Sequence, residues 1–280
     1  MIRRWHGAVA LLAALLPGFG GVTANAAETL RIGGTGAALG TMERLAADLR
    51  KRDPSFTYEI LPNLGSGGGL KALVKGAIQM AVISRPLKQE EHNADLVATE
   101  YGRSPFVIVT AKPGVSNIGL AQLVDLYADK GAKWPDGSSV RLVLRPRSDI
   151  DAELLASFSP EMNAALQSAM LREGMVVAAT DRESADAVIR LPGAVGTSSL
   201  SLLLTENRRL TPLAINGVQP TVANLERGAY PYGKSMSVVV RKPLSPATEQ
   251  FLKFLSSETG RRILVETGHA LPKGTTGKAN

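Results

Sequence analysis

Apolar residues change their spacing along the chain in a regular way, from short continuous runs to a helical period. The run at residues 30–32 precedes apolar residues at 42, 45, 46 and 49, whose i, i+3, i+4, i+7 spacing predicts a helix. Residues 56–61 and 80–83 predict two more strands, with a second helix beginning at Leu70. This strand–helix–strand–helix–strand order predicts a parallel sheet with helices on its faces.

The same alternation continues, with longer connections, to the end of the chain. Further strands are predicted at residues 106–110, 140–144, 176–179, 187–189, 210–215 and 237–241. Further helices are predicted over 120–127 and 149–158, and two more follow Ser245, where Pro246 suits a first helical position. No low-complexity linker is present, and two α/β lobes of roughly 100–130 residues each fit the length.

The first residues have the three parts of a secretory signal. Arg3 and Arg4 precede an uncharged apolar run at residues 8–16, and a small-x-small sequence at residues 24–26 precedes Ala27. The alternative, an amphipathic anchor helix, would need a polar face that this run lacks. We therefore predict a cleaved signal peptide over residues 1–27 and a mature chain that is periplasmic or otherwise extracytoplasmic.

Composition narrows the classes of function. The chain of 280 residues contains no cysteine, which excludes a disulfide scaffold, a zinc finger, an iron–sulfur site and a thiol nucleophile. The formal net charge is +7, and loss of Arg3 and Arg4 with the signal lowers it to +5. The remaining basic residues are dispersed rather than gathered with aromatic residues, so nucleic acid is not an expected partner. A small anionic ligand remains compatible with this charge.

Four segments at predicted strand ends carry hydrogen-bond donors: residues 34–40, 65–69, 84–86 and 145–151. Ligands of open α/β sheets bind at such ends, next to helix N-termini. Taken singly, each segment has an ordinary alternative: a tight turn, a flexible glycine loop, a surface salt bridge, or a helix N-cap. Together their N–H, hydroxyl and guanidinium groups predict a chelate for a small anion. The candidate ligand-binding residues are Thr35, Gly36, Ser66, Gly67, Ser84, Arg85, Arg145, Ser148 and Asp149.

Other chemical motifs fail in their context. Residues 228–235 (GAYPYGKS) match the phosphate-loop string, but a predicted helix precedes them and a strand follows, the reverse of what that motif requires. The glycines of residues 34–40 are spaced one residue too long for a dinucleotide turn. His92 and His269 have no visible nucleophile partner, so no catalytic residue, metal or cofactor is expected. An exported hydrolase that uses Asp149 and Asp151 is the enzymatic alternative.

The run at residues 64–87 (LGSGGGLKALVKGAIQMAVISRPL) resembles the phosphate-type family of periplasmic substrate-binding proteins of ABC transporters. Residues 120–127 with 134–137, residues 191–196 and residues 251–260 are similar to the same family. The resemblance implies an α/β, two-lobed type II periplasmic binding protein fold, each lobe a mixed, mainly parallel sheet flanked by helices. We expect lobe one over residues 28–108 and 240–280, and lobe two over residues 109–239, joined by two crossover strands.

The resemblance also implies roles for single residues. Thr35, Ser66 and Ser84 would donate from the first lobe, and Arg145 and Ser148 from the second. Phosphate binders of the family commonly have Asp where this chain has Arg85, and Ser-Gly-Thr where it reads Ser148-Asp-Ile. These departures leave phosphate, another oxoanion and an anionic organic solute open, with Asp149 as a substitute acceptor.

The sequence therefore predicts a non-enzymatic, exported solute-binding protein for a small oxoanion, with phosphate as the first candidate. Its expected partner is an ABC permease in the membrane, and the expected state is a monomer without a cofactor. The alternative is an extracytoplasmic sensory or accessory module of the same fold with altered or lost ligand binding.

Overall fold

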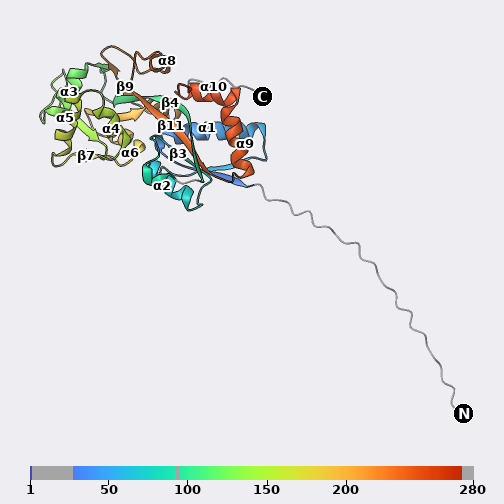
Figure 1. Cartoon of the computed structure of the whole chain (residues 1–280). Coiled ribbons are helices and arrows are strands. Elements are labelled where there is room, and N and C mark those ends of the chain that lie inside the picture. The colour runs from blue at the N-terminus through green and yellow to red at the C-terminus, as the bar shows by residue number, and fades with distance from the viewer. Residues whose placement is uncertain (2–27, 93–94, 273–280) are drawn as a thin grey trace.

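Strand β4 (Leu96–Thr110) passes from one lobe of the molecule into the other and organises the fold (Figure 1). The computed structural model describes residue 1, residues 28–92 and residues 95–272, so the predicted signal peptide lies almost wholly outside the described residues. Residues 96–105 of β4 pair with β11 (Gly233–Arg241), and residues 106–110 pair with β8 (Ala194–Ser199). We therefore define lobe one as the described residues of 28–105 and 233–272, and lobe two as 106–232.

The helices and strands follow the alternation that the sequence predicts. In lobe one, besides the first part of β4, they are β1 (Thr29–Gly34), α1 (Gly36–Arg52), β2 (Thr57–Ile60), α2 (Gly65–Val74), β3 (Met80–Ile83), a short 3-10 helix (Gln89–Glu91), β11, α9 (Pro246–Ser256) and α10 (Glu258–Glu266). In lobe two they are β5 (Asn117–Ile118), α3 (Leu120–Ala128), β6 (Arg141–Leu144), α4 (Ile150–Ala156), α5 (Pro160–Met170), β7 (Val176–Val177), α6 (Asp181–Arg190), β8, α7 (Leu200–Thr205), β9 (Thr211–Pro212), β10 (Ala214–Ile215) and α8 (Val222–Glu226).

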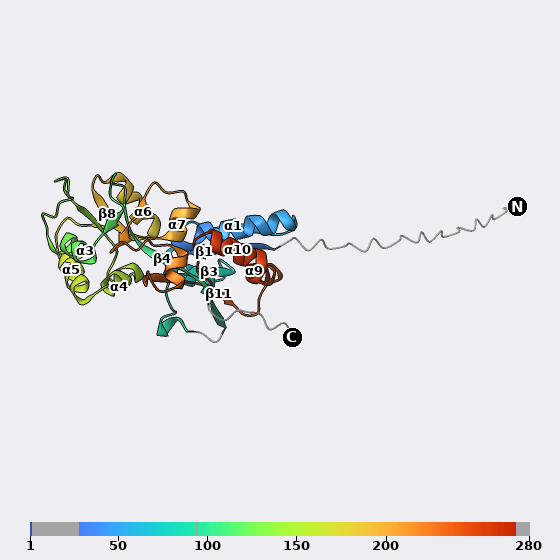
Figure 2. The same cartoon turned by 90° about the horizontal axis from the view of Figure 1, so that it is seen from above.

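One mixed sheet runs through both lobes in the order β2-β1-β3-β11-β4-β8-β6-β7. In lobe one, β1 pairs in parallel with β2 and β3, and β11 is antiparallel to both β3 and β4. In lobe two, β6 is parallel to β7 and β8, whereas β4 is antiparallel to β8. The helices α1, α9 and α10 gather on lobe one, and α3 and α5 lie at the far end of lobe two (Figures 1 and 2).

Each lobe has its own hydrophobic core. In lobe one the predicted face of α1, at residues 42, 45, 46 and 49, is buried against Leu30, Ile32 and Phe251. In lobe two, Phe106, Leu123 and Tyr127 belong to the corresponding cluster. Burial of these apolar side chains supplies the main driving force for each lobe.

Two sequence predictions about single elements are wrong, and some elements, β8 among them, were not predicted. Residues 65–69 are the first turns of α2 rather than a loop, because glycine lets the helix approach the sheet closely: a Cβ on Gly69 would lie 2.7 Å from the Cα of Gly34. Residues 187–189 are helical, because Thr180 caps α6 and accepts a hydrogen bond from the N–H of Glu183. The strand β8 was not predicted, because its sequence (AVGTSS) is half polar although every residue is buried.

The strand pairing of β11 indicates where the chain crosses between the lobes for the second time. From Gly233 onward, β11 pairs along its whole length with strands of lobe one. This favours a second crossing just before Gly233, ahead of the division at residue 239 that the sequence suggests.

Candidate solute site between the lobes

A polar pocket of about 260 Å³ lies between the two lobes, where several strands of the sheet end. Its lining comes from the four strand-end segments that the sequence singles out and also from Lys88, residues 179–181 and Lys234. The lining residues are Thr35, Gly65, Ser66, Gly67, Ser84, Arg85, Lys88, Arg145, Pro146, Ser148, Asp149, Ile150, Ala179, Thr180, Asp181 and Lys234. Every predicted ligand-binding residue except Gly36 is among them.

The lobe-one wall is a chain of hydroxyl groups. Thr35 follows β1, Ser84 follows β3, and Ser66 lies in the first turn of α2. The Ser84 hydroxyl donates to Thr35 Oγ1 at 3.3 Å, and the Ser84 N–H donates to Ser66 Oγ at 3.2 Å. The parallel strands bring these side chains to one edge of the sheet, as in other open α/β folds.

Gly36 lies beside the pocket but outside its lining. It is the first residue of α1, and a Cβ there would meet Asn63 Nδ2 at 2.7 Å and Arg182 Cγ at 3.3 Å. Glycine at this position therefore allows α1 to pack closely against its neighbours.

The lobe-two wall is built around Arg145, which follows β6 and is buried. Its guanidinium contacts Asp149 Oδ2 at 2.7 Å, Asp151 Oδ2 at 3.4 Å and Asp181 Oδ1 at 3.6 Å. Asp149 also caps α4 by accepting from the N–H of Asp151, so its capping role and its place in the pocket coexist. Ser148 is exposed at the edge of the same wall.

Lys234, on β11, is a central residue of the pocket that the sequence reasoning missed. Its side chain is 1% exposed, and its Nζ lies 2.5 Å from Asp151 Oδ1 and donates to Asp181 Oδ1 at 2.6 Å. Burial alone would lower the pKa of Lys234, but Asp151 and Asp181 outweigh it and raise the pKa, so the ammonium stays charged. Lys234 is the lysine of the GAYPYGKS sequence at residues 228–235. That sequence is not a phosphate loop, but it places this lysine in the pocket.

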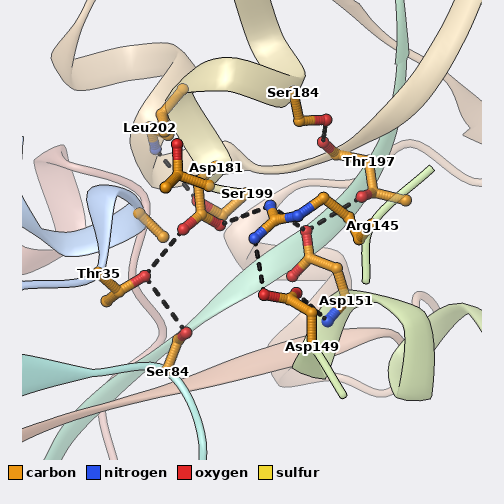
Figure 3. Close-up of polar contacts among 12 residues, drawn as sticks. Thr35, Ser84, Arg145, Asp149, Asp151, Asp181, Ser184, Thr197, Ser199 and Leu202 are labelled. Atoms are coloured by element: carbon orange, nitrogen blue, oxygen red, sulfur yellow. Dashed lines mark hydrogen bonds and ion pairs between the residues drawn. The ribbon is translucent and has the colours of Figure 1, made fainter. Parts of the chain in front are cut away.

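Asp181, the first residue of α6, was missed as well. Its Oδ2 accepts a hydrogen bond from the Thr35 hydroxyl at 2.9 Å, across the pocket from lobe one (Figure 3). Burial tends to raise the pKa of Asp181, but Lys234 and Arg145 lower it well below its usual value, so the carboxylate is ionised. Asp181 follows the predicted strand at residues 176–179, and that strand end was the available signal.

The charges in the pocket largely compensate one another. Two buried cations, Arg145 and Lys234, face the three carboxylates of Asp149, Asp151 and Asp181. Burial and the neighbouring Asp151 raise the pKa of Asp149 above its ordinary value. With all five groups ionised the cluster carries one net negative charge, which an anionic solute must overcome.

Arg85 lies in the pocket lining, but its charge is already matched. Its two terminal nitrogens donate to the Glu91 carboxylate at 2.6 and 2.7 Å, a bidentate pair. This pair raises the pKa of Arg85, while the Glu91 pKa falls below its usual value. Arg85 therefore contributes to the rim of the pocket as half of an ion pair.

The described residues show neither a metal-ion cluster nor a membrane-spanning helix. Within that part of the chain, no group of three or more His, Cys, Asp or Glu side chains is arranged to hold a metal ion. None of the helices in the described ranges is long and apolar enough to cross a bilayer.

The sequence matches a known protein superfamily over most of its length. A model described as a PBP superfamily domain matches residues 21–259. The chain belongs to the PBP superfamily. Its α/β architecture is that of the type II periplasmic binding proteins, so the predicted fold is confirmed, and membership of a family of binding proteins confirms the expected non-enzymatic character.

Several of the similar proteins are named for the binding of phosphate or molybdate. The phosphate-binding protein PstS of Bacillus subtilis is 24% identical over 258 residues, covering 89% of this chain and 82% of that protein. A putative phosphate ABC transporter substrate-binding protein from Clostridium perfringens, solved with bound phosphate, has a TM-score of 0.72 at 22% identity, covering 88% and 100% of the two chains. The periplasmic molybdate-binding protein of Azotobacter vinelandii has a TM-score of 0.63 at 16% identity, covering 87% and 100%. These structural likenesses establish the fold of this PBP superfamily chain.

Proposed function

We propose that this chain is an exported solute-binding protein that captures a small oxoanion, phosphate in the first place, in the pocket between its lobes. The observation that carries the proposal is the convergence of the Thr35, Ser66 and Ser84 hydroxyls with Arg145 and Lys234 around one pocket. The names of the relatives support a phosphate-sized oxoanion, and the molybdate-binding protein with this fold supports testing other oxoanions.

Capture would proceed by a shift of the lobes toward a closed state. A solute oxoanion in the pocket contacts donors of both lobes, so it binds the closed arrangement better and increases its population. Hydroxyl groups donate to the oxoanion, and Arg145 and Lys234 supply charge-assisted hydrogen bonds in place of water. Closure therefore couples solute capture to a change of shape that a membrane protein can recognise.

Export and delivery form the second half of the proposal. We place the mature chain in the periplasm or an equivalent extracytoplasmic space, because its first residues have the parts of a signal peptide. The proposed partner is an ABC permease, to which a monomeric chain delivers the solute. The relative with bound phosphate is named as a phosphate ABC transporter protein, which supports this partner.

A second candidate function is favoured by the carboxylates of the pocket. Asp149, Asp151 and Asp181 outnumber the cations they contact, which weakens the attraction for a second anion. A sensory or accessory module with altered or lost anion binding would have such a pocket.

Isothermal titration with phosphate, sulfate, molybdate and tungstate decides between the two. Saturable binding of phosphate at one site is expected for the solute-binding protein. Ser66→Ala should weaken it by up to roughly tenfold through loss of one hydrogen-bond donor, whereas Ser168→Ala on the outer helix α5 should leave it unchanged. The absence of heat and of any thermal shift with all four anions at millimolar concentration would favour the module.

A further inference from the structure

The carboxylate of Asp181 is surrounded by the donors that an oxoanion would use. Its Oδ2 accepts from the Thr35 hydroxyl at 2.9 Å, while its Oδ1 accepts from Lys234 Nζ at 2.6 Å and lies 3.6 Å from Arg145 Nη1. A hydroxyl, an ammonium and a guanidinium thus converge on two oxygen atoms of one anion, and Figure 3 shows the contacts of Thr35 and Arg145 with Asp181. The carboxylate is also deeply buried, because the Asp181 side chain is 6% exposed.

These contacts join the two lobes. Asp181 begins α6 in lobe two, whereas Thr35 follows β1 and Lys234 lies on β11, both in lobe one. Asp151 of lobe two adds a second ion pair to Lys234. The contacts across the pocket that a captured solute would mediate are therefore partly present in the chain alone.

The hydrogen-bonding capacity of the Thr35 hydroxyl is already used by Asp181 and Ser84. A threonine hydroxyl has one proton to donate, and the Thr35 proton is directed to Asp181 while its oxygen accepts from Ser84. Thr35 cannot donate to a solute until Asp181 leaves. Asp181 and a solute oxoanion therefore compete for the same proton and for the same two cations.

We infer that Asp181 is a resident carboxylate that fills the anion position of the pocket and links the lobes in the solute-free protein, so that an oxoanion binds by displacing it. The claim that an oxoanion displaces Asp181 rests on the proposed function, whereas the claim that Asp181 fills the anion position does not. Asp181 sets the affinity of the pocket, because a solute binds only the fraction of molecules in which the carboxylate has moved away.

Removal of the side chain leaves a site that a free carboxylate can refill. Asp181→Ala should melt at a lower temperature than wild type, because Lys234 and Arg145 lose a counterion. Sodium formate or acetate should raise the melting temperature of Asp181→Ala in a saturable way, with no such rise for wild type. Asp186→Ala is the matched control: it removes a half-buried carboxylate of the same helix, paired with Arg208 outside the pocket, and should show no formate-dependent rise.

Titration with phosphate then tests displacement. The Asp181→Ala variant should bind phosphate roughly tenfold or more tightly than wild type, whereas Asp186→Ala should match wild type. Asp181→Asn keeps the size of the side chain and an acceptor for Thr35 but removes the charge, and it should also bind phosphate more tightly. If Asp181→Ala does not fold, this isosteric variant decides the question.

The outcomes separate the inference from the proposed function. A response of Asp181→Ala to formate, without phosphate binding by any variant, supports the resident carboxylate and counts against phosphate capture. Phosphate binding of equal or lower strength in the Asp181 variants than in wild type overturns the inference and leaves the solute-binding function intact. Indifference of a folded Asp181→Ala variant to formate, acetate and phosphate also overturns it.

Discussion

Lys234 is one of the two buried cations that balance the carboxylates of the pocket. It is the only lysine among the described residues with a fully buried side chain, and it separates two carboxylates that would otherwise repel each other. A buried ion pair that loses one partner leaves an uncompensated charge, which is strongly destabilising.

Replacement of Lys234 by Met should therefore lower the free energy of unfolding by about 3–5 kcal/mol. Urea unfolding at neutral pH measures this loss, and Lys253→Met on the exposed side of α9 should stay close to wild type. Adding Asp151→Asn should recover part of the loss, because it removes one of the unpaired charges. A loss below about 1 kcal/mol in Lys234→Met would contradict the described ion pairs.

The rim of the pocket offers a second test at single residues. Glu91 neutralises Arg85, so Glu91→Gln should release a positive charge beside the pocket and strengthen phosphate binding a few-fold at low salt. The gain should shrink as ionic strength rises, because the rim is reached by solvent. Glu90→Gln, at the neighbouring exposed position, should have little effect. Equal binding of phosphate by Glu91→Gln and wild type at low salt would show that Arg85 does not act on the site.

Most of the pocket lining lies in segments that could be predicted from the sequence. These segments carry hydrogen-bond donors at strand ends, and such ends lie together in an open α/β sheet. Lys234 and Asp181 escaped for different reasons. Lys234 lies inside a strand of lobe one, which was predicted to begin only at residue 237. Asp181 has the local sequence of an ordinary helix start, where acidic residues are common. Both depend on contacts between segments that are far apart in the sequence.

At the scale of elements, α2 shows how packing outweighs local propensity. Glycine is a poor helix former, yet α2 begins at Gly65 with glycines at 67, 68 and 69. Gly69 lies against Gly34, whose φ of +143° suits glycine and which lies directly beside Val82 of β3. The spacing of the apolar residues predicts the part of the helix that begins at Leu70. The spacing does not reveal the glycine turn before it, because that turn depends on a tertiary contact between the backbones of helix and strand.

Two glycines of α2 provide a matched pair of substitutions. A Cβ on Gly69 would lie 2.7 Å from Gly34 Cα, so Gly69→Ala should push α2 from the sheet and destabilise the protein by about 1–3 kcal/mol. At Gly67 the nearest atom is Arg85 Nη2 at 3.8 Å, so Gly67→Ala should be neutral or slightly stabilising. Urea unfolding of both variants checks this order, and the reverse order would contradict the described packing of α2.

On the scale of the whole molecule, the alternation of strands and helices predicted the α/β class, and the length and the family resemblance predicted two lobes, whereas the exact strand order was not predicted. The antiparallel insertion of β11 between β3 and β4 joins the end of the chain to its first half. The end of the chain also packs on β4: His269, which follows α10, is buried and lies beside Tyr101, with ring centroids 5.5 Å apart.

Buried His269 should make the stability of the fold depend on pH. Burial lowers its pKa to about 4 from an ordinary value near 6.5, partly offset by its hydrogen bond to the Leu264 carbonyl. The unfolded chain thus takes up a proton first as pH falls, and stability should decrease between about pH 6.5 and 4, by up to about 3 kcal/mol. Chemical unfolding across this range should show a shallower pH dependence for His269→Leu, with exposed His92→Leu behaving as wild type. Parallel profiles for wild type and His269→Leu would contradict this contribution.

The most direct test of the central claim is a crystal structure of the protein grown with phosphate. We predict density for one tetrahedral anion between the hydroxyls of Ser66 and Ser84 and the guanidinium of Arg145, with the Asp181 carboxylate moved away from Thr35. Phosphate bound elsewhere on the molecule, or a pocket without phosphate in which Asp181 still accepts the Thr35 hydrogen bond, would contradict it.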